Sequence, residues 1–225
     1  DTIELYPAAY GDKFPAHRLD LNGDTCIHIV DFSYPPEVIT EVSSAVEEIN
    51  ILDHHKTAIE KFEGYDKPEN VWIIFDTAQS GAGLAWNFYH PAGKKMPRML
   101  EHIQDRDLWK FELMNSKAFH LNLSTLPKTI ECWSEVSQAI ELDLVVGEMI
   151  KETGTKFTGY YDEFIACGLA IERYYNQTVE SIIAQMKRPV IVNGIAGLSC
   201  NCNGMFASDI GNILAKESGT FGLTW

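Results

Sequence analysis

Three side chains that can bind a metal ion or a phosphate occupy consecutive positions in the segment ILDHHKTA, residues 51–58. Asp53, His54 and His55 directly follow a short apolar run. Carboxylates suit Mg²⁺ and Mn²⁺, and Mn²⁺ also accepts imidazole. Two such ions about 4 Å apart can hold a phosphoryl group and generate the hydroxide that attacks it. The triplet is therefore a candidate for part of a metal-dependent phosphohydrolase site.

Four more aspartates lie where they could complete such a site. Asp31 and Asp76 each end an apolar run, and Asp105 and Asp107 lie in the segment QDRDLW. Each has a structural alternative. Asp31 could cap the helix that follows it, and capping is favoured over ligation for Asp76. Asp105 and Asp107 could instead form ion pairs with Arg106.

The triplet has structural alternatives as well. Asp53 could accept a hydrogen bond from a histidine ring and orient it, without binding a metal itself. A single histidine such as His54 or His55 is more often a structural residue than a ligand. A separate structural explanation would be needed for each of several residues at neighbouring strand ends, and this favours a common site.

The elements that must position these residues follow a strand–helix–strand–strand–helix rhythm. The predicted strands are residues 25–31, 49–53 and 71–76, and the predicted helices are residues 34–50, 80–90 and 97–111. This order indicates an α/β fold with a mostly parallel sheet and helices on both faces. In such sheets the ligand crevice lies outside the carboxyl ends of the strands. Asp31, Asp53 and Asp76 all lie at those ends.

The character of the chain changes near residue 127. Two helical stretches follow, the second roughly 30 residues long, and then two strands joined by a glycine turn and a further helix. We expect a phosphoesterase-type domain over residues 1–126, a helical connector over 127–187, and a second, smaller α/β domain over 188–225. The aromatic residues of the second stretch could pack against another subunit in a homodimer, or the stretch could be an ordinary interdomain helix.

Charge and cysteine content restrict the partners and the compartment. The chain has 32 acidic and 18 basic residues and a formal net charge of −14. Duplex DNA would be repelled by such a surface, so a phosphate substrate needs a local positive centre such as a metal ion. The five scattered cysteines predict a reduced, cytoplasmic chain, with the Cys200–Cys202 pair in a turn rather than in a zinc site. No membrane-spanning segment or signal peptide is visible.

Four segments in order carry a family resemblance: IVDFSYPPE, ILDHHKTA, SGAGLAW and IQDRDLWKFEL. This set resembles the DHH phosphoesterase superfamily, and it is closest to the oligoribonuclease-like and cyclic-nucleotide-phosphodiesterase-like members. The resemblance covers residues 1 to about 120 well and extends more weakly to MFASDIGNILAKESGTFGLTW. It implies hydrolysis of phosphodiester bonds in short oligonucleotides or small cyclic nucleotides, with two Mn²⁺ or Mg²⁺ ions in the intact family site.

The resemblance also implies roles for single residues. Asp31 matches the carboxylate that bridges two ions, and His54 matches the ligating histidine. His55 matches the histidine that faces the phosphate, and Asp53 orients. Asp105 matches the last metal-binding aspartate, with Asp107 as the alternative. The cations expected to help neutralise the phosphate are Arg106 and Lys56.

One departure limits what this chain should do. The family's Asp-x-Asp-Gly motif is absent, and so is the glycine- and histidine-rich loop that closes the substrate pocket. We therefore interpret the sequence as a family member that lacks both ends. It should bind at most one ion weakly, through Asp31, His54 and Asp105, and show little turnover. The alternatives are a non-catalytic nucleotide- or partner-binding module and, ranked last, an inorganic pyrophosphatase.

Overall fold

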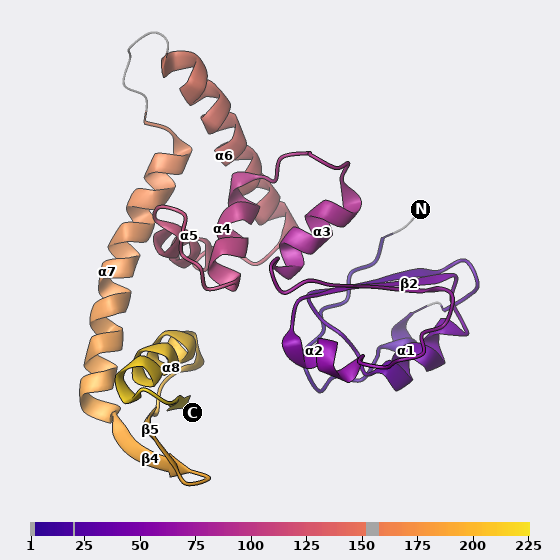
Figure 1. Cartoon of the computed structure of the whole chain (residues 1–225). Helices are drawn as coiled ribbons and strands as arrows, with labels where there is room; N and C mark the ends of the chain where they lie inside the picture. The colour runs from indigo at the N-terminus through magenta and orange to yellow at the C-terminus, as the bar shows by residue number, and fades with distance from the viewer. Residues whose placement is uncertain (1–2, 20, 152–157) are drawn as a thin grey trace. The chain divides into compact units, whose positions relative to one another are not determined.

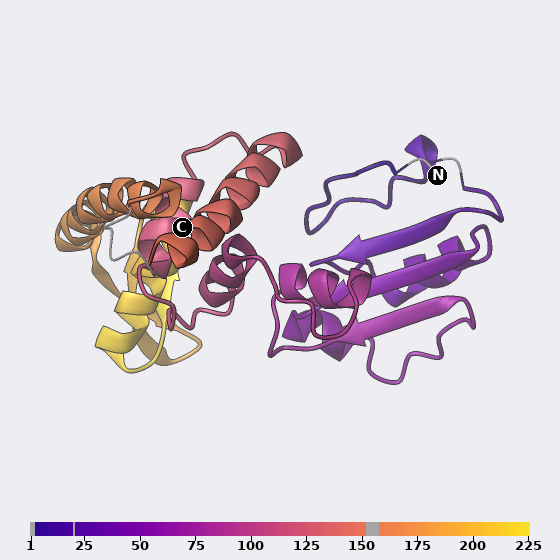
Figure 2. The ribbon, with the colours of Figure 1, turned by 90° about the horizontal axis from the view of Figure 1, so that it is seen from above.

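In the computed structural model, which describes residues 3–19, 21–151 and 158–225, three parallel strands carry the Asp-His-His triplet. The strands are β1 (Cys26–Val30), β2 (Glu48–Asp53) and β3 (Val71–Phe75), in the order β1-β2-β3. They run side by side in Figure 2. The register aligns Val30 with Leu52, and Asp53 with Phe75. The predicted strand ends therefore do meet at one edge of the sheet.

Helices cover both faces of this sheet. Alternate strand residues such as Ile29, Ile49 and Ile51 form one core with Ile39 and Val42 of α1 (Pro36–Ser43). The short helix α2 (Lys56–Lys61) follows the triplet and links β2 to the parallel strand β3. Helix α2 was not among the predicted elements, although parallel neighbours need a crossover connection.

Helix α3 (Gly81–Tyr89) packs on the opposite face of the sheet. His28 of β1 points away from its neighbour Ile29, and its ring lies 5.5 Å from the ring of Tyr89. Helices α4 (Arg98–Asp107) and α6 (Ile130–Lys151) belong to the same part of the chain, where α4 packs on both α3 and α6 (Figure 1). A 3-10 turn, η1 (Ala16–Arg18), precedes the sheet.

The remaining elements form a second unit around a mixed sheet. Strands β4 (Arg188–Val192) and β5 (Ile195–Cys200) form the predicted hairpin through Asn193 and Gly194, which both have positive φ as a tight two-residue turn requires. β6 (Gly222–Thr224) joins β5 in parallel. The long helix α7 (Tyr160–Met186), α5 (Ser116–Leu123) and α8 (Gly204–Ser218) supply the rest of the core.

The two compact units differ in extent from the predicted ranges. One comprises the residues up to Ser116 together with those from Pro127 to the end of α6, and the other comprises 117–126 and 158–225. The predicted connector over 127–187 is thus not one piece, because α6 and α7 belong to different units. The mixed α/β class and the parallel sheet are confirmed. Among the described residues, no helix combines the length and apolarity needed to cross a membrane.

One glycine fixes the packing of α7 in the second unit. A Cβ at Gly168 would overlap the backbone of Ala118 in α5, whose side chain is fully buried. Gly211 in α8 is a matched control, because a Cβ there would meet only ordinary contacts. We expect Gly168→Ala to destabilise this unit by roughly 1–3 kcal/mol through overpacking. Gly211→Ala should stabilise it by about 0.5–1 kcal/mol. The free energy of unfolding of both variants, measured with a denaturant, tests this. Equal changes in the two variants would contradict the close approach of Gly168 to the backbone of Ala118.

Candidate metal and phosphate site

Asp31 leaves the sheet through an unusual backbone conformation. It follows the last residue of β1 and has φ 59°, while its N–H donates to the carbonyl of Leu52 at 2.8 Å. Few residues other than glycine adopt this left-handed region, and aspartate is among the more tolerant of them. Such strain is found disproportionately at functional sites. The turn brings the Asp31 carboxylate to the edge where His54 follows β2.

The start of α3 is packed directly on Asp31. A Cβ at Gly81 would overlap the Asp31 side chain, and one at Gly83 would overlap Gln104. The Ser80 hydroxyl accepts from the Gly83 N–H at 3.1 Å, and the Ser80 N–H donates to Gln104 Oε1 at 3.1 Å. The small residues of SGAG therefore allow the positive end of this helix to approach a carboxylate. The Ser/Gly entry into this helix is the one predicted from the sequence, whereas the contacts with Asp31 and Gln104 were not predicted.

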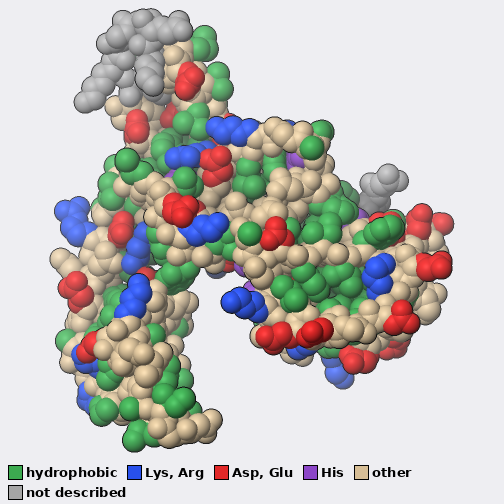
Figure 3. Space-filling view, viewed as in Figure 1, with side chains coloured by type: hydrophobic (Ala, Val, Ile, Leu, Met, Phe, Trp, Pro, Cys, Tyr) green, Lys and Arg blue, Asp and Glu red, His purple; other side chains and the backbone are tan. Residues whose placement is uncertain are grey.

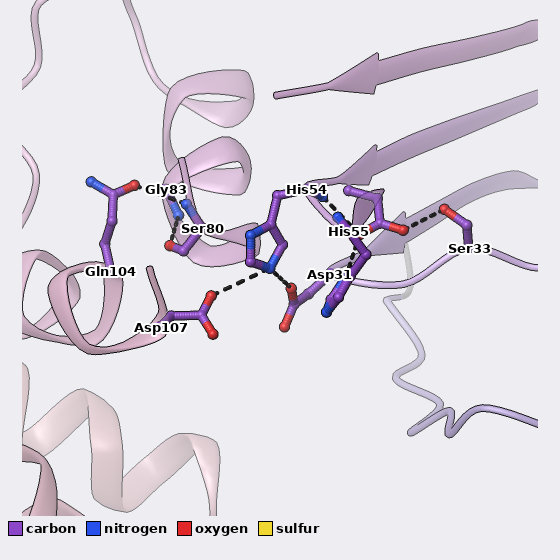
Figure 4. Close-up of polar contacts among 9 residues, drawn as sticks. Asp31, Ser33, His54, His55, Ser80, Gly83, Gln104 and Asp107 are labelled. Atoms are coloured by element: carbon purple, nitrogen blue, oxygen red, sulfur yellow. Dashed lines mark hydrogen bonds and ion pairs between the residues drawn. The ribbon is translucent and has the colours of Figure 1, made fainter. Parts of the chain in front are cut away.

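His54 lies between two carboxylates. Its Nε2 is 3.1 Å from Asp31 Oδ1 and 3.4 Å from Asp107 Oδ2 (Figure 4). The side chain is only 11% exposed, and among the described residues this nitrogen has no partner in hydrogen-bond geometry. Ligand atoms of Asp31, His54 and His55 lie within 4.8 Å of one another. A buried ring nitrogen flanked by two carboxylate oxygens has the donor set that a divalent cation such as Mn²⁺ accepts.

The electrostatics of Asp31 also fit a cation. Burial raises the pKa of Asp31, and the negative charge of Asp107 raises it further, against the opposing influence of His54 and His55. Neighbouring negative charges disfavour the ionised form of a carboxyl group. A bound divalent ion would remove this repulsion and favour both charged forms.

Asp53 is fully buried and organises the triplet through hydrogen bonds. Oδ1 accepts from the backbone N–H of His54 at 2.7 Å, from that of His55 at 3.1 Å, and from His55 Nδ1 at 2.7 Å. Oδ2 accepts from the Ser33 hydroxyl at 2.6 Å. Burial alone would raise the pKa of Asp53, but the bonds from Ser33, His55 and the two amides together hold it below its usual value. The orienting role expected for Asp53 agrees with this geometry, and the role of Ser33 was missed.

Asp105 is engaged elsewhere. Its Oδ1 accepts from the Glu112 N–H at 2.9 Å, and its Oδ2 from the Leu113 N–H at 3.2 Å. Both oxygens therefore tie down the loop after α4, while Asp107 faces His54. The structure thus favours Asp107 over Asp105 as the ligand, which reverses the order of preference drawn from the sequence.

The two expected cations lie in different surroundings. The guanidinium of Arg106 lies over the ring of Trp109, 4.1 Å from its centroid, and Lys56 is an exposed residue in the first turn of α2. Asp76 does not cap α3, because the N-cap of that helix is Ser80. Its carboxylate instead accepts from the Ala78 N–H at 2.8 Å and from the Gln79 amide at 2.7 Å in the turn before the helix.

Comparison with known proteins adds one relative and no function. No family model and no solved structure matches the chain. An uncharacterized protein of Acanthamoeba polyphaga mimivirus is 27% identical over 229 residues, which cover 98% of this chain. The chain spans 49% of the length of that viral protein.

Acid should weaken the site through Asp53. Because its pKa is lower in the folded chain than in the unfolded chain, ionised Asp53 contributes stability above the ordinary aspartate pKa, and this is lost as the pH falls through the lowered value. Asp53→Asn should cost roughly 1–3 kcal/mol at neutral pH, because an amide group would meet donors on both sides. The destabilisation caused by Asp53→Asn should be smaller in acid, where Asp53 of the wild-type chain is itself protonated. Urea unfolding at several pH values measures this, and a loss independent of pH would contradict it.

Proposed function

We propose that this chain is a metal-dependent phosphoesterase that hydrolyses phosphodiester bonds of short oligonucleotides or small cyclic nucleotides. The observation that carries the proposal is the buried Nε2 of His54, set between the carboxylates of Asp31 and Asp107. Beside it, Asp53 holds the ring of His55 at the same edge of the sheet. The ordered resemblance to the DHH phosphoesterases supplies the reaction class.

Three residues would hold the cation: Asp31, His54 and Asp107. They offer two carboxylate oxygens and one imidazole nitrogen, which suits Mn²⁺ and, less well, Mg²⁺. When bound, such an ion lowers the pKa of a coordinated water and polarises a phosphoryl oxygen. The family site implies two ions, but this set of described ligands is sufficient for only one.

His55 is suited to handle a proton or a phosphoryl oxygen. Its Nδ1 bonds to Asp53, so the tautomer with the proton on Nδ1 leaves Nε2 as the free nitrogen of the ring. The side chain is 38% exposed, so a reacting group could reach it. The Nε2 nitrogen can accept a proton from a reacting group, and a protonated imidazole can donate to a phosphoryl oxygen.

The surface favours a small substrate. Acidic side chains surround much of the sheet-bearing unit on the face drawn in Figure 3, in line with the net charge of −14. Such a field disfavours long contacts with a nucleic-acid backbone. The positive end of α3, packed on Asp31, provides local compensation.

Metal binding can be tested separately from turnover. We expect the chain to bind about one equivalent of Mn²⁺ in calorimetric titration, as three ligands for one ion imply. His54→Ala and Asp107→Asn should each weaken binding by roughly tenfold or more, about 1.4 kcal/mol. Asp76→Asn is the control and should retain the wild-type affinity. Loss in Asp105→Asn with retention in Asp107→Asn would restore the assignment preferred from the sequence.

A second assay tests the reaction class. Diadenylate, a cyclic nucleotide and pyrophosphate are each incubated with the chain and Mn²⁺. We expect slow hydrolysis of a phosphodiester that is abolished by a chelator and by His54→Ala, and strongly reduced by His55→Ala. Faster release of phosphate from pyrophosphate would indicate a pyrophosphatase. Binding of Mn²⁺ and nucleotide with no turnover would instead indicate the non-catalytic module, which the count of three ligands also allows.

A further inference from the structure

A tight turn before the sheet displays one aromatic side chain. The N–H of Asp12 donates to the carbonyl of Ala9 at 3.0 Å, and the N–H of Ala9 donates back to Asp12 Oδ2 at 2.9 Å. Gly11 has φ 96°, which the third position of a type II turn requires. Tyr10 occupies the second position of this turn, so its backbone is held from both sides.

Aromatic contacts attach this turn to the segment that follows Asp31. The ring of Tyr10 lies 5.1 Å from that of Phe32, which lies 4.9 Å from Tyr34, and Phe14 lies 5.1 Å from Tyr34. Phe32 and Tyr34 are buried members of the sheet core. The position of Tyr10 is therefore tied to the same loop that positions the Asp31 carboxylate.

Besides Phe32, the ring of Tyr10 contacts the candidate site. Its ring lies 5.8 Å from the ring of His55 at an interplanar angle of 84°, and the residue is 60% exposed. The edge-on contact leaves much of the tyrosine ring open to solvent beside a histidine that would face the phosphate. An exposed aromatic ring next to a phosphate site is the platform on which a nucleobase stacks, because every base offers a π-face.

We propose that Tyr10 stacks against the nucleobase of a nucleotide whose phosphate lies at His55, beside the cation ligands Asp31, His54 and Asp107. This rests on the proposed function, and it adds that the base is recognised and not only the phosphate. Tyr10 is thus a specificity-determining residue. The alternative is that Tyr10 only supports the ring of His55, in which case it would affect every phosphate ligand equally.

Two probes separate these roles: adenosine 5′-monophosphate and ribose 5-phosphate, each titrated in the presence of Mn²⁺. They share the phosphate and the sugar and differ in the base. We expect the wild-type chain to prefer the nucleotide by on the order of tenfold. Tyr10→Ala should remove this preference and leave the affinity for ribose 5-phosphate unchanged. Tyr10→Phe should keep it, and Tyr6→Ala, in the same segment, is the control.

The outcomes distinguish this inference from the proposed function. Equal binding of both probes by the wild-type chain, or equal weakening of both in Tyr10→Ala, overturns the base contact and leaves the phosphate site intact. A wild-type chain that binds Mn²⁺ but neither probe overturns both proposals. A preference that survives in Tyr10→Ala places the base contact elsewhere and likewise overturns the role of Tyr10.

Discussion

The buried carboxylate of Asp53 is the fixed point on which the candidate site depends. It is the last residue of the central strand of a three-stranded parallel sheet, and it accepts hydrogen bonds from Ser33, from His55 and from two consecutive backbone amides. A buried carboxylate is costly unless its oxygens are satisfied, so these bonds stabilise the fold and orient the triplet together. They direct His54 toward Asp31 and Asp107 while the ring of His55 stays partly exposed.

Two further constraints hold the partners of the triplet in place. Asp31 adopts a left-handed conformation at the end of β1, and the missing side chain of Gly81 allows α3 to start against its carboxylate. Gln104 joins the first turn of α3 to α4, the helix that ends at Asp107. The site thus draws on two strand ends and two helices, and each needs the others in place. This interdependence is typical of a preorganised ligand site.

The sequence predicts the part of the site that depends on strand ends. Apolar runs that stop at Asp31, Asp53 and Asp76 imply a parallel sheet with its carboxylates at one edge, and the register confirms this.

The choice between Asp105 and Asp107 could not be made in this way. Residues two apart on a helix point about 200° away from each other, so only one can face His54. The deciding bonds come from amides of a later loop, whose path through Trp109 and Phe111 at positive φ is not encoded in any periodicity. The residue ranges of the two units could not be predicted either. The periodicity of an amphipathic helix such as α7 shows that one face is buried, but not in which hydrophobic core.

The central claim is that Asp31, His54 and Asp107 together hold a divalent cation. The most direct measurement is the anomalous scattering of Mn²⁺ in crystals of this chain. The account predicts one strong peak within coordination distance of His54 Nε2, with an oxygen from each of Asp31 and Asp107 bound to it. A peak bound instead by Asp105, or no peak beside His54 at saturating Mn²⁺, would contradict it.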